Sequence, residues 1–496
     1  MRIFGVLRRK FFFFILHFYP TPLHEIGIDF SLANQFTAMD LRMRTHLLAR
    51  SSCSSQSKSK DTSFATRPTR LESLNKGFRV AIFMRQAISR TVSVVIIAVI
   101  VLAAVAGVLS YVYFVHPSTA KPIIIGMEAE LSGTLAPDGQ QEQEGAQMAV
   151  NEINSNGGVL GSQLKLIAQD ETSSPLGAAQ ILVNQDNASF LIGPTFSGEV
   201  ESVLPFTNSH KVIELMSIAS LDALMTAPQN QYLFRTTLPD SGYGFLATQW
   251  LEQIHAKTVM LQYEDLIYTH EVDNYTRLDT SSANISILSS DFYPLTATDY
   301  STAVAKIASL KPDAVVVVME GTNGIDFEKQ YAANPTTAAI PILHLETLLS
   351  VAQNAQAVDS AVANGMNNVF LAPSNTITNQ TTSWETKFIS LYHTTGDSYA
   401  QDAYATVYML VQAIKQAGST NTDAVASALA SQTFLGPGGF YAFTSTHNAK
   451  VGAGYLSGTL YQVKVDSSGN IHYNIIWPPA FANATAVNPA TGSPFS

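Results

Sequence analysis

Cysteine is almost missing from this chain of 496 residues, which holds only Cys53. A disulfide needs two cysteines and a cysteine-based zinc site needs more, so neither can form in the remainder of the chain. Charge is also scarce, because Asp, Glu, Lys and Arg make up 13% of the residues, about half the usual share. Hydrophobic residues reach 46%, which is ample for packed cores. The length favours two or three structural units.

The net charge is positive only in the first part of the chain. Residues 1–83 hold 13 Lys and Arg against 5 Asp and Glu, whereas the chain from Thr91 onward holds 13 against 33. Nucleic-acid binding needs a basic face, which so acidic a body does not offer. We therefore expect no nucleic-acid partner. A small anionic group remains possible as a ligand, because a local site can differ from the net charge.

Patterns typical of catalysis and of cofactor binding are missing as well. The 11 histidines are scattered, and no two of them have the HxxxH spacing of a helical metal site. The sequence shows no glycine-rich phosphate loop and no nucleophile beside a base. We expect neither a cofactor nor a resident metal, and the protein is not predicted to be an enzyme.

The segment 1–90 does not have the pattern of a folded domain. It opens with a basic and aromatic cluster, Arg8–Phe14, and continues through a tract rich in Ser and Lys at Ser51–Lys60. Residues 1–83 are either a disordered cytoplasmic tail or a mitochondrial-type presequence, or they are not made because translation starts at Met84. Met84, followed by Arg85 and an apolar run, is typical of a secretory or anchored N-terminus, so we favour the third interpretation.

A long apolar run follows. Thr91–Val115 comprises 25 residues without a charge, enough for a helix that spans a bilayer with some tilt. Arg85 and Arg90 precede it, and the positive side of such a span stays in the cytoplasm. The sequence therefore predicts a single-pass membrane protein with an extracytoplasmic body. Ser118–Ala120 is a passable cleavage site, which leaves release of the body open.

From Lys121 onward, short apolar runs alternate with amphipathic ones. Pro122–Met127 and Leu164–Ala168 have the pattern of strands, and Gln140–Asn154 between them has that of a helix. Ala314–Met319 is continuously apolar, as expected of a strand covered on both faces. This alternation predicts an α/β fold with parallel sheets.

One stretch, Phe190–Ser220, indicates where a ligand could bind. It reads as strand, hydroxyl-bearing loop, helix, strand and a second hydroxyl-bearing loop. Parallel strands place such loops side by side at their carboxyl ends. Ser197 would open a helix, and the free N–H groups there attract anions such as a carboxylate. The alternative is that Ser197 and Ser220 only cap or turn the chain.

Several longer motifs carry a family resemblance. They are Leu131-Ser132-Gly133, Gly145–Asn154, Asn156–Gly161, Leu191–Pro194, Leu233–Thr237, and Asp299-Tyr300 followed by Lys311–Asp313. With these motifs, the region from Pro122 to about Pro478 resembles the type I periplasmic binding proteins. The most similar group is the branched-chain amino acid (Leu/Ile/Val) and amide-binding proteins of ABC importers. The paired cysteines characteristic of that family are missing here.

The resemblance implies an α/β fold of two Rossmann-like lobes joined by a three-crossing hinge and preceded by one transmembrane helix. Hinge closure around a ligand is the motion that such an architecture permits. The implied segments are 121–236 and 375–450 for lobe 1, 238–372 and 454–478 for lobe 2, and 479–496 for a flexible tail. The implied crossings lie near Arg235–Leu238, Leu371–Ser374 and Ala449–Gly454.

The resemblance also implies a set of ligand-binding residues. A ligand carboxylate would meet Ser197 together with Ile218, Ala219 and Ser220. Tyr268 would cover the ligand, and Glu346 would hold its ammonium group. Two positions depart from the family, because Asp138 and Glu320 stand where aromatic residues are expected. These acids would make the site too acidic for a plain aliphatic amino acid and favour a more cationic or polar solute, or an amide.

By the same resemblance, the protein is expected to be an extracytoplasmic solute-binding protein that delivers its ligand to an ABC permease in the membrane. The alternative is a ligand-sensing extracellular receptor domain that acts through a partner signalling protein. No output module follows the body in this sequence, so sensing would depend on that partner.

Overall fold

The computed structural model describes residues 95–107, 120–226, 230–346, 369–372, 378–452, 454–465 and 471–495. The chain divides into two compact units, Met1–Val105 and Ala106–Ser496. The expectations for residues 1–94 lie outside the described residues. So does part of the second implied crossing, since 373–377 are not described.

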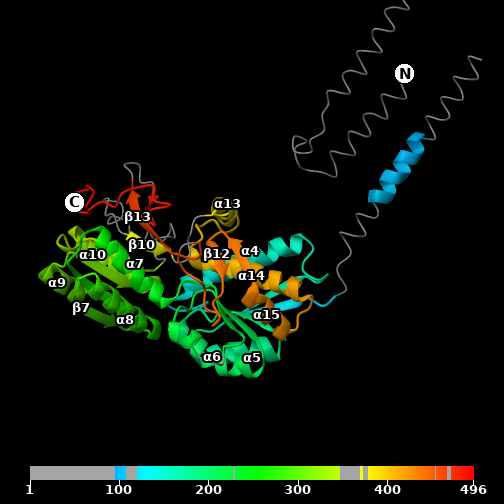
Figure 1. The fold of residues 1–496 in the computed structure, drawn as a ribbon, viewed down its shortest axis with the longest axis horizontal. Coiled ribbons are helices and arrows are strands. Elements are labelled where there is room, and N and C mark those ends of the chain that lie inside the picture. Colours follow the sequence, from blue (N-terminus) through cyan, green and yellow to red (C-terminus); the bar gives the residue numbers. More distant parts are fainter. Residues whose placement is uncertain are drawn as a thin grey trace, which may run out of the picture. The chain divides into compact units, whose positions relative to one another are not determined.

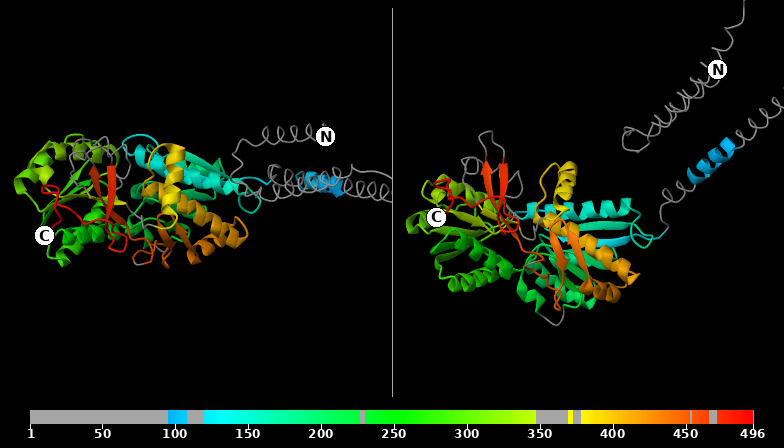
Figure 2. Two further views of the ribbon diagram at one scale, coloured as in Figure 1. Left: turned by 90° about the horizontal axis from the view of Figure 1, so that it is seen from above. Right: turned by 45° about the horizontal axis from the view of Figure 1, so that its top comes forward.

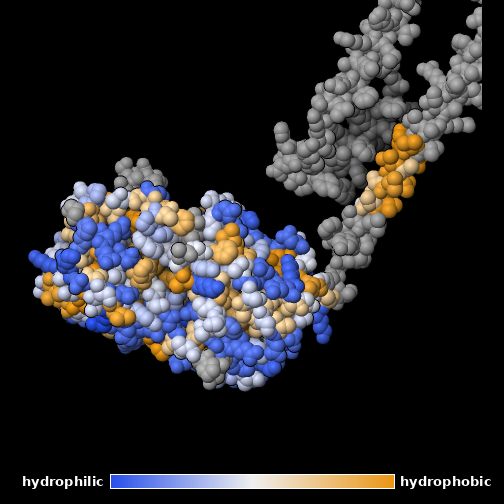
Figure 3. Space-filling view, viewed as in Figure 1, coloured by the Kyte–Doolittle hydropathy of each residue, from blue (hydrophilic) through white to orange (hydrophobic). Residues whose placement is uncertain are grey.

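A helix over 95–107 closes the first unit, and its apolar side chains are exposed. Ile97 is 61% exposed and Leu102 is 68% exposed, and Figure 3 shows the helix covered by hydrophobic side chains. In the part of the chain that the structure describes, no helix is both long enough and apolar enough to cross a membrane. The rest of the predicted span 91–115 lies outside that part.

The second unit contains a first sheet of five parallel strands in the order β2-β1-β3-β4-β5. Most of its side chains are buried because helices cover both faces, which confirms the predicted parallel α/β pattern. The strands are β1 (Ile123–Ala129), β2 (Leu164–Asp170), β3 (Phe190–Ile192), β4 (Ile213–Met216) and β5 (Leu233–Arg235). The helices between them are α4 (Ala136–Ser155), α5 (Pro175–Asn184), α6 (Ser197–Ser209) and the 3-10 helix η2 (Asp222–Met225).

A later part of the chain returns to this sheet, and together they form what we call lobe 1. Its elements are α13 (Thr381–Tyr392), α14 (Ser398–Ala417), α15 (Thr422–Ser431), β11 (Thr433–Gly436) and β12 (Gly439–Ala442). Helix α14 packs along α4, and both contribute to one hydrophobic core (Figure 1). The helices touch at Gly145, where a Cβ atom would lie 2.0 Å from the carbonyl oxygen of Ala400.

A second sheet and its helices form lobe 2. The sheet order is β14-β13-β10-β9-β8-β6-β7, and β13 runs antiparallel to both of its neighbours. Figure 2 shows β13 and β14 beside the strands of this sheet. Its strands are β6 (Thr258–Glu264), β7 (Ser286–Tyr293), β8 (Ala314–Val318), β9 (Ile342–His344), β10 (Val369–Ala372), β13 (Thr459–Val465) and β14 (Ile471–Trp477). Its helices are α7 (Asp240–Gln253), α8 (Ile267–Ser282), α9 (Ser301–Leu310), α10 (Gly321–Ala333) and η3 (Thr337–Ala339).

Two expectations differ from the observed structure. Helix α4 begins at Ala136 and not at Gln140, because Pro137 is well suited to a first helical turn; Asp138 is therefore helical. The segment 479–495 was expected to be a flexible tail but contacts lobe 2. The Gln462 side chain donates to Val487 O (2.8 Å) and accepts from Val487 N (2.9 Å), and Ala486 is buried.

Lobe 1 carries an acidic pair inside its sheet. Glu128 on β1 and Glu214 on β4 are fully buried. Glu214 Oε2 accepts a hydrogen bond from Thr207 Oγ1 at 2.5 Å, whereas neither carboxyl oxygen of Glu128 has a partner among the described residues. Burial raises the pKa of Glu214 to about 8. Burial, and then the charge of Glu214, raise the pKa of Glu128 well above its usual value. Both groups therefore hold protons at neutral pH.

This pair predicts that the ligand-free protein becomes less stable as pH rises from about 4.5 to about 8. An unfolded glutamate releases its proton near the model value of 4.5, whereas folded Glu214 keeps its proton to about 8. Each proton retained in this way lowers the unfolding free energy by about 1.4 kcal/mol per pH unit within that window. Chemical denaturation at pH 5 and pH 8 would measure the loss.

In the Glu214→Gln variant we expect a shallower loss of stability, since an amide keeps the contact with Thr207 without titrating. Glu201 on the same helix as Thr207 is exposed, so Glu201→Gln serves as the control and should leave the pH slope unchanged. An unchanged slope in Glu214→Gln would contradict the assignment of a retained proton.

Candidate functional site

Three glutamates of lobe 2 stand where parallel strands end. Glu264 is the last residue of β6, Glu320 follows β8 as the N-cap of α10, and Glu346 follows β9. All three are about 99% buried or more. Carboxyl ends of neighbouring parallel strands meet at one edge of a sheet, which explains why residues so far apart in sequence lie close together.

Tyr399 reaches these glutamates from lobe 1. It is the second residue of α14, whose N-cap Asp397 accepts the N–H of Ala400 at 2.9 Å. The Tyr399 hydroxyl lies 2.5 Å from Glu320 Oε1 and 2.8 Å from Glu346 Oε2. A phenol has one hydrogen to donate. Two hydrogen bonds at these distances therefore require that at least one of the two carboxyls is protonated.

A second tyrosine, Tyr268 of α8, completes the arrangement in lobe 2. Its hydroxyl lies 3.1 Å from Glu264 Oε1 and 3.4 Å from Glu346 Oε1. Its ring stacks against Phe196 of lobe 1, with ring centroids 6.4 Å apart. The other oxygen of Glu264 accepts the N–H of Glu320 at 3.2 Å. These contacts join three strand ends of lobe 2 and touch lobe 1 at Tyr399 and Phe196.

The electrostatics of this region are those of acids without cations. Burial raises the pKa of Glu346 to about 8 and that of Glu264 to about 7. Burial, and then the charge of Glu346, raise the pKa of Glu320 well above its usual value. The same holds for Asp138 of lobe 1, where the charge of Glu320 is the largest effect after burial. Asp138 Oδ2 and Glu320 Oε2 have no hydrogen-bond partner among the described residues.

The two hydroxyl-bearing loops of lobe 1 meet as the sequence indicated. Ser197 Oγ accepts the backbone N–H groups of Ser220 and Leu221, each at 3.2 Å. Both lone pairs of Ser197 are thereby used, so its O–H remains available to donate. The N–H of Ser220 donates to Ser197 Oγ, so it is not available to a ligand in this state. Ile218 and Ala219 between the loops are buried.

Two further glutamates hold these loops in place. Glu142 of α4 accepts hydrogen bonds from Ser217 Oγ at 2.5 Å and from Thr195 Oγ1 at 3.2 Å. Glu171, after β2, accepts the N–H of Thr195 at 2.7 Å. Burial raises the pKa of Glu142 to about 7, and the two hydroxyl donors oppose that rise. These two glutamates therefore hold the loops in position through hydrogen bonds to Ser217 and Thr195.

The sequence-predicted residues thus fall into two groups. Tyr268, Glu320 and Glu346 lie in one hydrogen-bonded cluster, and Asp138 acts on that cluster through its charge. Ser197, Ile218, Ala219 and Ser220 form a second group on lobe 1. Sequence reasoning missed Tyr399 and Glu264. Glu264 carried the same signal as Glu346, an acid at a strand end, whereas nothing local marked Tyr399.

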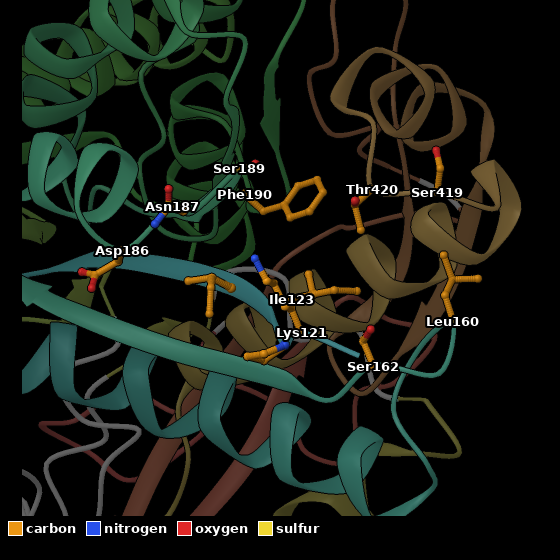
Figure 4. A pocket seen from close by; sticks show the side chains of 12 residues that line it. Lys121, Ile123, Leu160, Ser162, Asp186, Asn187, Ser189, Phe190, Ser419 and Thr420 are labelled. Carbon is orange, nitrogen blue, oxygen red and sulfur yellow. The ribbon is translucent and has the colours of Figure 1, made fainter. Parts of the chain in front are cut away.

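A groove of about 780 Å³ lies elsewhere, at the beginning of the strands of lobe 1. Figure 4 shows Lys121 and Ile123 at the start of β1, Phe190 at the start of β3, and Ser419 and Thr420 after α14 around it. Ligands of parallel α/β sheets bind at the opposite, carboxyl edge. We therefore place the candidate site at the buried acids Glu264, Glu320 and Glu346, which lie at the carboxyl ends of the lobe 2 strands. Within the described residues no group of three or more His, Cys, Asp or Glu could hold a metal ion.

Comparison with known proteins gives concordant matches. A family model described as periplasmic binding protein matches residues 122–470. The Leu/Ile/Val-binding protein of Escherichia coli (strain K12) is 25% identical over 205 residues, which are 41% of this chain and 56% of that protein. The chain thus spans little more than half the length of this relative. A Leu/Ile/Val-binding protein of Rhizobium johnstonii is 26% identical over 321 residues, 63% of this chain and 84% of that one.

Solved structures share the fold. The branched-chain amino acid transporter substrate-binding protein of Streptococcus pneumoniae, solved with isoleucine, has a TM-score of 0.63 and 24% identity over 72% of this chain and 100% of its own. A solute-binding protein of an ABC transporter from R. palustris, solved with benzoate, has a TM-score of 0.63 and 19% identity over 72% of this chain and 97% of its own. With the family match over most of its length, this chain belongs to the periplasmic binding proteins.

Proposed function

We propose that this protein is the extracytoplasmic solute-binding protein of an ABC importer, and that it closes its two lobes around a small amino-acid-like or amide solute. The observation that carries this proposal is the contact of Tyr399 of lobe 1 with Glu320 and Glu346 of lobe 2. Buried hydrogen bonds between lobes describe a closed state. The acids in these hydrogen bonds can also accept hydrogen bonds from N–H groups of a solute.

Each part of the site has a role in this proposal. The free O–H of Ser197 would donate to a carboxylate or carbonyl oxygen of the solute. Glu346 and Glu320 would accept its N–H groups, and Tyr268 would cover it. The Tyr399 hydroxyl would stay at the site and donate to one of the two acids, so that Tyr399 and the solute together link the lobes. A solute that binds the closed form more tightly than the open form shifts the protein toward closure, and a permease would then receive it.

A screen of amino acids, amides and urea against the full chain tests this function. A true ligand at about 100 times its dissociation constant should stabilise the protein by about 2.7 kcal/mol in thermal unfolding. Small-angle scattering should show a smaller radius of gyration with that ligand. In Tyr399→Phe we expect affinity to fall by about tenfold or more, because buried carboxyls lose a donor.

Tyr408→Phe is the matched control for Tyr399→Phe. Tyr408 also donates to a glutamate, Glu152 Oε2 at 2.9 Å, near the far end of α4. This variant should bind the ligand normally. Equal loss of affinity in both variants would point to a general effect on lobe 1 and would contradict a site at Tyr399.

We also propose that residues 91–115 tether the body to the membrane. The support is the run of 25 residues without a charge and the exposure of apolar side chains on all sides of helix 95–107. A helix that is apolar all round is stable only in an apolar environment. The positive charges of Arg85 and Arg90 before this run favour an orientation in which the body lies outside the cytoplasm.

The anchor proposal predicts that the full chain stays with membranes washed in alkaline carbonate. Leu102→Asp should release a large part of it, because an aspartate at the centre of a span costs about 3 kcal/mol. Leu391→Asp is the control, since Leu391 is an exposed residue of α13 in the body. Release of the unaltered chain by the wash would exclude the anchor.

A further inference from the structure

We propose that the solute is a small organic dication whose two cationic groups pair with the carboxyl cluster formed by Asp138, Glu264, Glu320 and Glu346. This inference rests on the proposed function, because it assumes that a solute enters between the lobes. It differs from that proposal in the chemical class of the solute, because a diamine takes the place of the amino acid or amide and offers no carboxylate or carbonyl oxygen to Ser197.

The first argument is the balance of charge at the cluster. Besides burial, the charges of other acids raise the pKa of Asp138, Glu320 and Glu346. The donors that the structure gives the glutamates are the hydroxyls of Tyr268 and Tyr399 and the N–H of Glu320. Charges in a buried site must be paired or neutralised. The described residues give these carboxyls no cationic partner, so we expect the solute to bring positive charge when the carboxyls ionise.

The second argument is an unused acceptor on the opposite lobe. Asp138 sits in the first turn of α4 and is 6% exposed, and its Oδ2 has no partner in the described chain. The charge of Glu320 in lobe 2 raises the pKa of Asp138 more than that of any other acid does. The start of α10 lies against the chain just before α4, since a Cβ atom on Gly321 would lie 2.4 Å from Thr134 O, so Asp138 and Glu320 belong to segments that meet between the lobes. Glu320 Oε2 likewise has no hydrogen-bond partner among the described residues. A solute with donors at both ends would satisfy an oxygen on each lobe.

The number of acids argues for two cationic groups over one. A zwitterionic amino acid would neutralise one carboxylate with its ammonium group but would add its own carboxylate to the site. A diamine adds no negative charge and can pair with acids of both lobes. Ammonium groups of this kind keep their charge well above neutral pH, as the lysine side chain does.

A dication would also displace protons from the cluster. The ionisable groups that interact with it lie on the elements around it: Glu130 after β1, Asp138 of α4, Tyr243 of α7, Glu264 of β6, Tyr268 of α8, Tyr300 before α9, Glu320, Glu346, and Asp397 with Tyr399 at the start of α14. In the absence of solute, burial raises the pKa of all four carboxyls and so favours their protonated forms. Diamine binding should release protons and tighten as pH rises, whereas a neutral amide should bind best to the protonated acids.

Isothermal titration calorimetry of the full chain in detergent tests this inference with 1,4-diaminobutane as the probe. We expect affinity to be about tenfold or more tighter at pH 8 than at pH 6, since each released proton contributes up to about tenfold per pH unit. Titration in two buffers of different ionisation heat should show net proton release. The monoamine 1-aminobutane should bind at least about tenfold more weakly than the diamine.

Variants of the cluster separate this inference from a general disturbance. Glu320→Gln and Asp138→Asn should each weaken 1,4-diaminobutane by about tenfold or more and reduce the proton release. Asp138→Asn keeps the shape of the helix turn and covers the case in which Glu320→Gln does not fold. Glu252→Gln, an exposed change on α7 of lobe 2, is the matched control and should bind as the unaltered chain does.

Tight binding of L-isoleucine or acetamide without binding of 1,4-diaminobutane would overturn the dication assignment and leave the binding-protein function intact. Diamine affinity that is flat or falls with rising pH would overturn it as well. The proposed function itself fails only when the wider screen of amino acids and amides also finds no ligand that closes the protein.

Discussion

One hydroxyl between two carboxyls is the contact on which the closed arrangement depends. Tyr399 has a single hydrogen to donate but lies 2.5 Å from Glu320 and 2.8 Å from Glu346. The second hydrogen bond exists only while one acid is protonated. Tyr399 is held in lobe 1 by the close packing of α14 on α4 at Gly145, and the acids are held by strand ends of lobe 2. The link between lobes is therefore sensitive to protonation.

Much of the fold could be predicted because its signals are local. Alternating runs and the apolar strand at Ala314–Val318 indicate covered parallel strands, and the structure confirms them. Tyr268, Glu320 and Glu346 were indicated by the family resemblance, and in the structure each follows a strand of one sheet. The predicted ends of helices were less accurate. With Pro137 in its first turn, α4 begins earlier in the chain than predicted, so Asp138 lies in a helix and not in a loop.

The parts that could not be predicted depend on packing between distant segments. Tyr399 belongs to a part of the chain that returns to lobe 1. The packing of its helix on α4, which includes the contact of Gly145 with Ala400 and the hydrogen bond from Tyr408 to Glu152, fixes the register of that helix. The N–H of Ser220 is bound to Ser197, which no spacing in the sequence could show. The contact of Gln462 with Val487 likewise pairs a strand with a tail that shows no periodic pattern.

Buried acids are numerous in this chain, and hydrogen bonds distinguish their uses. Glu142 and Glu171 accept from Ser217 and Thr195, so they hold loops in position. Glu128 has no hydrogen-bond partner among the described residues, but it lies within the sheet of lobe 1, where the neighbouring acid Glu214 raises its pKa further. Glu320 also lacks a partner for one oxygen, yet it lies where strands end and the other lobe begins. An unsatisfied acceptor is costly in either place, but only at the strand ends can a solute supply the missing donor.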